Sequence, residues 1–177
     1  MCMRNFIRLL PLLPAIAAVA ATGEEAGRYI ESDVYVATAF AGAPPQASTL
    51  WVSGGLRGAI EQTLGHRFAA LRVRYWDDGE TSVWILDEIG KELPITIGVT
   101  VRDSRIANVR VLEFRESRGW EVRYPFFTDQ FHDTTLGTNG RLNRQIDGIT
   151  GATLSVGAVT RIAQTALIFD DHIRNKK

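Results

Sequence analysis

The residues best suited to chemistry form a run of small and polar side chains that leads into a predicted C-terminal helix. In order, the run reads Asp147-Gly148-Ile149-Thr150-Gly151-Ala152-Thr153-Leu154-Ser155. The first amides of a helix have no partner within the helix, so such a position attracts phosphate or another anion. The glycines allow a bulky group to approach the backbone closely, and Asp147 is able to cap nearby amides. Taken alone, these residue types favour an ordinary glycine-rich turn over an anion-binding loop.

The rest of the composition excludes several kinds of chemistry. The chain of 177 residues has 20 basic and 20 acidic side chains, so it lacks the positive charge of a nucleic-acid-binding protein. Its one cysteine, Cys2, leaves the rest of the chain without disulfides, iron–sulfur ligands or a thiolate nucleophile. His66, His132 and His172 are too widely separated to predict a metal site. No nucleophile elbow, phosphate-loop lysine or dinucleotide motif is present in the sequence, so we name no catalytic residue.

Residues 1–21 have the pattern of a secretory signal peptide. Arg4 and Arg8 precede an apolar run, and residues 18–20, Ala-Val-Ala, provide the small side chains that cleavage needs. The run is shorter than a membrane span and contains two prolines. We therefore expect export to the periplasm or another extracytoplasmic compartment, with a membrane anchor as the alternative if the segment stays uncleaved. Cleavage would also remove Cys2 and leave a mature chain without a thiol.

The remaining sequence predicts one α+β domain. Residues 22–50 are rich in Ala, Gly and Pro and are expected to be a loosely packed lead-in to a domain over residues 51–177. Apolar residues at helical spacing predict a helix over 56–64 and another from Thr153 to about Ile173. We expect at least four antiparallel strands in two hairpins, packed with a few helices, and the glycine-rich loop leading into the last helix. Alternating side chains place these strands at 70–76, 81–86, 95–101 and 106–114, with turns at 77–79 and 103–104.

Residues 147–153 resemble the flavinylation motif of the FMN-binding domain family. This family includes the covalent-FMN subunits of the sodium-pumping NADH:quinone reductase and of Rnf-type electron-transport complexes, and its pattern is approximately Asp-x-x-Ser/Thr-Gly-Ala-Thr. In the family the final threonine is joined to FMN by a phosphoester, so the resemblance implies that Thr153 is the attachment residue. It also implies that the loop binds the cofactor through Asp147, Gly148, Thr150, Gly151, Ala152, Leu154 and Ser155.

The resemblance extends upstream and covers about residues 95–170. The hairpin over 97–114 and the residues that follow it are similar to the family's strand pair and its flavin-contacting loop, Glu-Thr-Pro-Gly. This implies flavin contacts from Glu116, Ser117 and Gly119, although Ser117-Arg118 stands where the better-known complexes have Thr-Pro. Two further groups fit either flavin contacts or ordinary structure. They are the aromatic residues Trp120, Phe126, Phe127 and Phe131 and the cations Arg118 and Arg123.

For function, the resemblance implies an exported FMN carrier that relays electrons between a membrane oxidoreductase and an acceptor. Threonine is a poor nucleophile without an activating base, and no histidine or lysine lies beside Thr153 in the sequence. The resemblance therefore implies a separate flavin transferase that uses FAD as the donor. Two other functions fit the sequence: a non-redox periplasmic binding or assembly module without flavin, and an FMN-dependent reductase of a small substrate. Because no acid–base pair is identified, we favour an electron carrier over a stand-alone enzyme.

Overall fold

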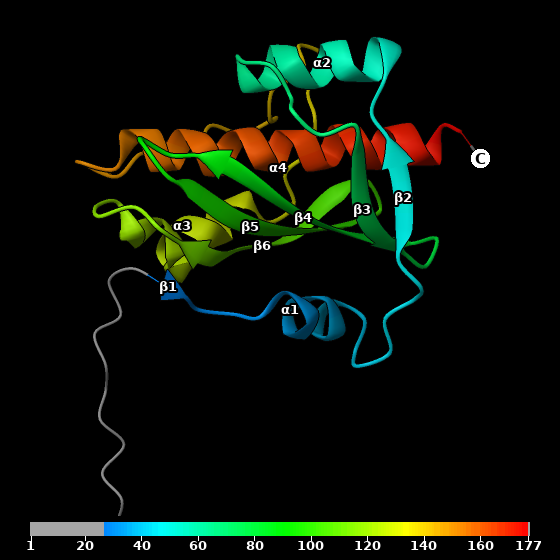
Figure 1. Ribbon diagram of the computed structural model, residues 1–177, viewed down its shortest axis with the longest axis horizontal. Coiled ribbons are helices and arrows are strands. Elements are labelled where there is room, and N and C mark those ends of the chain that lie inside the picture. Colours follow the sequence, from blue (N-terminus) through cyan, green and yellow to red (C-terminus); the bar gives the residue numbers. More distant parts are fainter. Residues whose placement is uncertain (1–26, 177) are drawn as a thin grey trace, which may run out of the picture.

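A six-stranded antiparallel sheet forms the centre of the fold in a computed structural model, which describes residues 27–176. The predicted signal peptide, residues 1–21, lies outside the described residues. The strands follow the order β1-β6-β5-β4-β3-β2 across the sheet (Figure 1). All four strands predicted from alternation are present, and the predicted α+β class is confirmed. The strands are β1 Gly27–Arg28, β2 Ser48–Trp51, β3 Arg72–Asp77, β4 Thr81–Ile89, β5 Pro94–Arg102 and β6 Arg105–Phe114.

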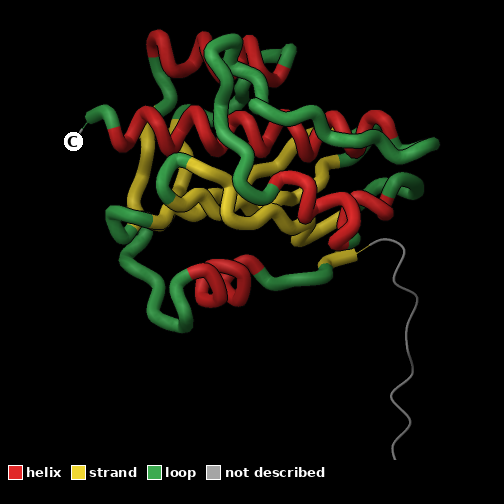
Figure 2. The backbone as a smooth tube through the Cα atoms, turned by 180° about the vertical axis from the view of Figure 1, so that it is seen from behind, coloured by secondary structure: helices red, strands yellow, loops and turns green. Residues whose placement is uncertain are grey.

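Helices cover both faces of this sheet. The long helix α4, Thr153–Arg174, lies along one face, and α2, Gly54–Leu64, packs on the outer side of α4. The short helix α1, Ser32–Ala39, lies on the opposite face, so the elements stack as α2, α4, sheet and α1 (Figure 1, and from behind in Figure 2). Both predicted helices are therefore confirmed. A short helical region follows β6 and consists of η1 Trp120–Arg123, α3 Pro125–Thr128 and η2 Asp129–Phe131.

The main hydrophobic core lies between the sheet and α4. On β5, alternate side chains from Ile95 to Val101 are fully buried, as strand geometry requires for a sheet covered on this face. The α4 residues predicted to share one helix face are buried against them, and these are Val159, Ile162, Ala163, Ala166 and Leu167. Burial of this apolar area is the main force that fixes α4, and with it Thr153 at its first turn.

Residues 27–50, the described part of the predicted lead-in 22–50, contribute more regular structure than their composition predicts. Within the described part of this segment, α1 buries Tyr35 and Val36 against the sheet. The Tyr35 hydroxyl shares a hydrogen bond of 3.0 Å with Thr100 Oγ1 on β5. Gly98 leaves room for the Tyr35 ring, since a Cβ at Gly98 would lie 2.5 Å from the nearest ring carbon. A glycine on β5 therefore allows α1 to pack closely on the second face of the sheet.

Residues 27–176 contain neither a membrane-spanning helix nor a cluster of metal-ligand side chains. No helix of this part of the chain is both long enough and apolar enough to cross a membrane. No group of three or more His, Cys, Asp and Glu residues in the same range is placed to hold a metal ion. Two of the three histidines instead lie beside single carboxylates, His66 beside Glu88 at 3.0 Å and His132 beside Asp133 at 3.1 Å.

Substitution of Gly98 by alanine tests the packing of α1. The added methyl group would overlap the Tyr35 ring, so Gly98→Ala should lower the free energy of unfolding by about 1–3 kcal/mol. Gly58→Ala in α2 is the matched control, because nothing lies within 4 Å of a Cβ at that site. That control should raise the free energy of unfolding by up to about 1 kcal/mol through helix propensity. Urea titration followed by circular dichroism measures both, and equal stability of the two variants would contradict the packing.

Candidate functional site

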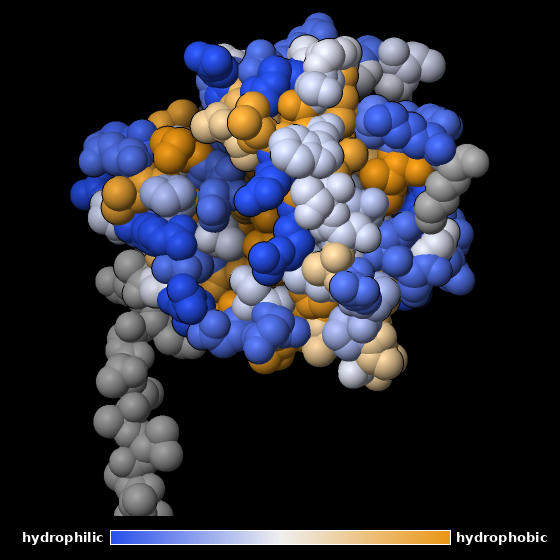
Figure 3. Space-filling view, turned by 45° about the vertical axis from the view of Figure 1, so that its right-hand side comes forward, coloured by the Kyte–Doolittle hydropathy of each residue, from blue (hydrophilic) through white to orange (hydrophobic). Residues whose placement is uncertain are grey.

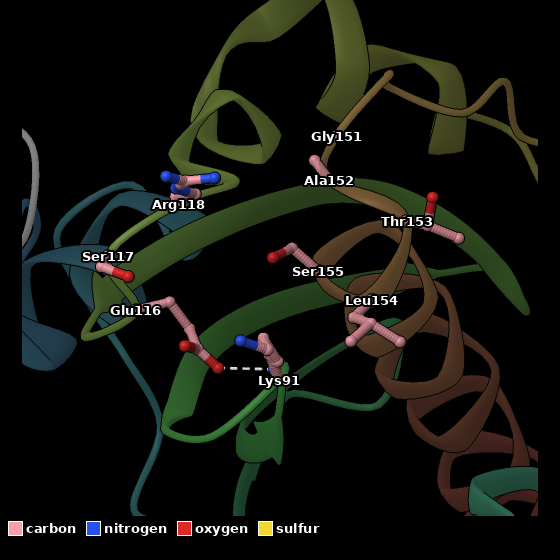
Figure 4. Close-up of a pocket in the computed structure, with 9 residues that line it drawn as sticks. All are labelled: Lys91, Glu116, Ser117, Arg118, Gly151, Ala152, Thr153, Leu154 and Ser155. Carbon is pink, nitrogen blue, oxygen red and sulfur yellow. Dashed lines mark hydrogen bonds between the residues drawn. The ribbon is translucent and has the colours of Figure 1, made fainter.

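A pocket of about 640 Å³ lies where three segments from distant parts of the sequence meet (Figure 4). The loop after β6 contributes residues 116–118, and the glycine-rich loop with the first turn of α4 contributes residues 151–155. The third segment is the turn between β4 and β5, which contributes Lys91. The sheet therefore positions two sides of the pocket, and α4 positions the third.

The first turn of α4 offers unpaired backbone donors to this pocket. Ala152 occupies the N-cap position, and its side chain provides no cap. The first bond of the helix runs from the Val156 amide to the Ala152 carbonyl at 2.9 Å, so the amides of residues 153–155 precede the helical ladder. Thr153 is exposed and lies on the outer side of this turn, whereas Ser155 points toward Glu116 and Arg118 (Figure 4). The arrangement is that of a helix N-terminal anion site with an accessible hydroxyl.

Two predicted site residues hold the loop after β6 against α4. Gly119 is buried and adopts a φ of +88°, in the left-handed region that favours glycine. A Cβ at Gly119 would lie 2.6 Å from Ser155 Oγ and 3.4 Å from the Cβ of Ala152. Gly119 thus lies directly behind the pocket wall and permits the close approach of the two loops.

Glu116 connects the loop after β6 to the β4–β5 turn. Its Oε1 accepts hydrogen bonds from the amides of Lys91, Glu92 and Leu93, at 2.5, 2.6 and 2.9 Å. The side chain is buried, which by itself raises the pKa of the carboxyl. The three amides and the Lys91 charge outweigh that effect, so the pKa of Glu116 lies below its ordinary value. Glu116 therefore lines the pocket, as predicted for a flavin contact, while one of its oxygens holds the turn that carries Lys91.

The predicted site residues divide into those that line the pocket and those that do not. Seven of them line it, namely Glu116, Ser117, Gly151, Ala152, Thr153, Leu154 and Ser155. Asp147, Gly148 and Thr150 do not; they lie earlier in the loop, where the Asp147 amide donates to Gln130 Oε1 at 2.7 Å. Among the aromatic residues, Phe127 and Phe131 are fully buried in the core, Trp120 packs at its edge, and Phe126 is 63% exposed.

Two cations at the pocket complete the site. Arg118 lines the pocket beside Ser117. The sequence leaves open whether this arginine contacts the flavin or belongs to the ordinary structure. Lys91 also lines it, and its ammonium lies 3.0 Å from the exposed carboxylate of Glu92. Sequence reasoning missed Lys91, because a single lysine in a hairpin turn carries no signal of its own. The preceding residue, Gly90, is the one feature of this turn that the contact with Glu116 explains, since a Cβ at Gly90 would lie 2.9 Å from Glu116 Oε1.

Comparison with known families agrees with this geometry. Residues 90–168 match a family whose description is FMN-binding domain. The matched range includes all three segments that form the pocket, and it confirms the resemblance seen in the motif. No curated protein matches the chain.

The contact between Gly119 and Ser155 predicts a large effect of one methyl group. Gly119→Ala should lower the free energy of unfolding by about 2–4 kcal/mol, because it adds overlap with Ser155 to the strain of a positive φ. Gly140→Ala is the control, since Gly140 also has a positive φ, +72°, but open space around its Cβ. Chemical denaturation should show the first variant to be less stable than the second. Ser155→Ala should recover part of the loss in the Gly119→Ala background, and full additivity of the two changes would refute the contact.

The three hydrogen bonds that Glu116 accepts predict how the stability of the fold depends on pH. The pKa of Glu116 is lower in the folded chain than its ordinary value of 4.5, so the ionised carboxylate stabilises the fold above that pH. This stabilisation is lost as the pH falls through the folded-state pKa. Glu116→Gln removes the charge and should cost about 1.5–3 kcal/mol at pH 7. The difference from wild type should shrink as the pH is lowered below about 4.5. Glu92→Gln, in the same turn but exposed, should have little effect at either pH, and a pH-independent difference for Glu116→Gln would argue against the assignment.

Proposed function

Because residues 90–168 belong to the FMN-binding domain family, the chain is an FMN-binding protein, and we propose that it carries FMN covalently on Thr153 as an electron carrier. The observation that carries the proposal is the position of Thr153. It is an exposed hydroxyl on the first residue of a 22-residue helix, at the edge of a pocket within the matched range. When bound, FMN supplies one- and two-electron chemistry, and the protein's part is to hold and orient it.

The residues of the pocket suit a phosphate next to Thr153. The uncapped amides at the start of α4 and the helix dipole favour negative charge there. Gly151 has a φ of +84° and open space around its Cβ position, so a phosphate group can lie close to the backbone at this point. Lys91 and Arg118 add positive charge on the opposite side of the pocket. Together these groups bind and orient the two ends of a phosphorylated cofactor.

Attachment requires a second protein. None of the residues that line the pocket is a histidine, the carboxylate of Glu116 is already held by the β4–β5 turn, and the ammonium of Lys91 is paired with the Glu92 carboxylate at 3.0 Å. We propose that Thr153 Oγ bonds to the FMN phosphorus of FAD while the pyrophosphate bond breaks. AMP then leaves with the bonding electrons, and the hydroxyl proton passes to a base of the flavin transferase. The exposure of Thr153 supports this step, because another enzyme must reach the hydroxyl.

Location and partners complete the proposal. The pattern of residues 1–21 supports export, followed by electron exchange between a membrane oxidoreductase and an acceptor outside the cytoplasm. A dissociable cofactor would be lost from such a compartment, and a phosphoester bond prevents that loss. The protein itself holds the flavin, while the reactions at either end belong to its partners.

Thr153→Ala tests the proposal directly. The chain is co-expressed with a flavin transferase, denatured, and examined for flavin fluorescence and for the mass of one FMN less one water. Wild type and Thr153→Ser should carry the flavin, because both retain a hydroxyl at the helix start, and Thr153→Ala should carry none. Thr138→Ala is the matched control, an exposed threonine outside the motif that does not line the pocket, and it should be labelled. An unlabelled wild-type chain, or a labelled Thr153→Ala variant, would disprove attachment at Thr153.

A further inference from the structure

Strands β3 and β4 separate after a short paired stretch. They pair at three positions next to their turn, the last of which joins Tyr75 to Trp84. Beyond that point β3 pairs with β2 at all four positions of β2, while β4 continues to Ile89 paired with β5 (Figure 1). The two strands therefore enclose a wedge-shaped gap, which we call the β3–β4 slot. Its volume is about 380 Å³.

The β4 side of the slot is a free strand edge. The last β3–β4 bridge, Tyr75 to Trp84, places Ile85 opposite Arg74, and within residues 27–176 no strand pairing joins residues 86–89 of β4 to β3 or to the loop before it. Unpaired strand edges are the sites at which proteins accept a further strand. Apolar side chains line this edge, namely Val73, Ile85, Leu86, Pro94 and Ile89, which is 47% exposed. The slot thus offers both backbone partners and apolar contacts to an extended chain.

The charge around the slot is mainly positive. Arg67, Arg72 and Arg74 line it and are exposed, and none of them forms an ion pair in the described part of the chain. The two carboxylates of the slot already have partners. Glu88 is buried and bonded by Arg161 at 2.8 Å and by His66 at 3.0 Å, and Asp87 accepts a hydrogen bond from Thr96. Figure 3, turned to bring β2 and β3 forward, shows strongly hydrophilic residues beside hydrophobic ones near the centre of this face.

We propose that the β3–β4 slot binds an extended, acidic segment of a partner protein, which pairs with β4 over residues 86–89. The free edge supplies the main-chain hydrogen bonds, and the three arginines select acidic side chains. This binding does not depend on FMN. In the carrier proposed above, the slot also places the partner close to the flavin, because Ile89 of the slot and Lys91 of the pocket are two positions apart in the chain, which is at most about 7 Å. That last consequence rests on the proposed function.

Three synthetic peptides test the slot on the unflavinylated chain. The first is a fluorescein-labelled alternating hexapeptide, (Glu-Val)₃, blocked at both ends. The second replaces its glutamates with lysines, and the third keeps the glutamates but N-methylates alternate residues to remove strand donors. The first peptide should bind and shift the NMR signals of the amides of residues 86–89. The second and third should bind at least tenfold more weakly, as measured by fluorescence anisotropy.

Charge reversal identifies the residues responsible. Arg72→Glu/Arg74→Glu should weaken binding of the first peptide at least tenfold, because both exposed side chains border the slot. Arg105→Glu/Arg141→Glu is the matched control, with two exposed arginines outside the slot, and should bind like wild type. Absence of binding, equal binding of the N-methylated peptide, or equal losses in the two double variants would each overturn the proposal. Flavin attachment at Thr153 is measured separately, so either proposal can fail without the other.

Discussion

The pocket depends on how firmly the first turn of α4 is held against the loop after β6. Gly119 allows Ser155 to approach, and Glu116 extends the same loop to the amides of the β4–β5 turn. A carboxylate bound by three amides in a buried position has little freedom to move, because each alternative conformation would leave buried polar groups unpaired. The turn, the loop and the helix start therefore form one unit, and Thr153 is placed at the edge of that unit rather than on a free loop.

The position of α4 along the sheet is set by polar contacts as well as by burial. Hydrophobic packing fixes which face of the helix meets β5 but tolerates small shifts along its axis. Two buried carboxylates remove that freedom. Glu88 on β4 is bonded by Arg161 in the middle of the helix, and Asp170 near its end accepts a hydrogen bond from Ser82 at 2.7 Å. Burial raises the pKa of Asp170, and the Ser82 hydroxyl and the Arg174 charge offset part of that rise. Such pairs are costly to separate, so they specify one register for the helix.

Local patterns predicted the elements that have a clear period, and missed those whose position depends on distant residues. Strands β3 to β6 and helices α2 and α4 alternate or repeat their apolar residues, so the sequence identifies them. Helix α1 buries just Tyr35 and Val36 among its eight residues, and two adjacent positions produce no helical stripe. In the site, the motif correctly located the start of α4, because a helix N-terminus is encoded locally. Lys91 reaches the pocket through the bonds between Glu116 and its turn, which are 23 to 25 residues apart in the chain and leave no local pattern.

The form of the pocket explains why a covalent bond suits the function that we propose. Its walls come from three short segments, and its polar groups lie at two ends, the amides of α4 and the cations Lys91 and Arg118. Polar groups at two ends orient a cofactor, whereas extensive apolar enclosure is what gives small ligands high affinity. A bond to Thr153 would keep the cofactor at a high effective concentration without that enclosure. One face of the flavin ring could then stay accessible to partner proteins. The covalent bond would hold the cofactor in place, and the accessible ring would exchange electrons with those partners.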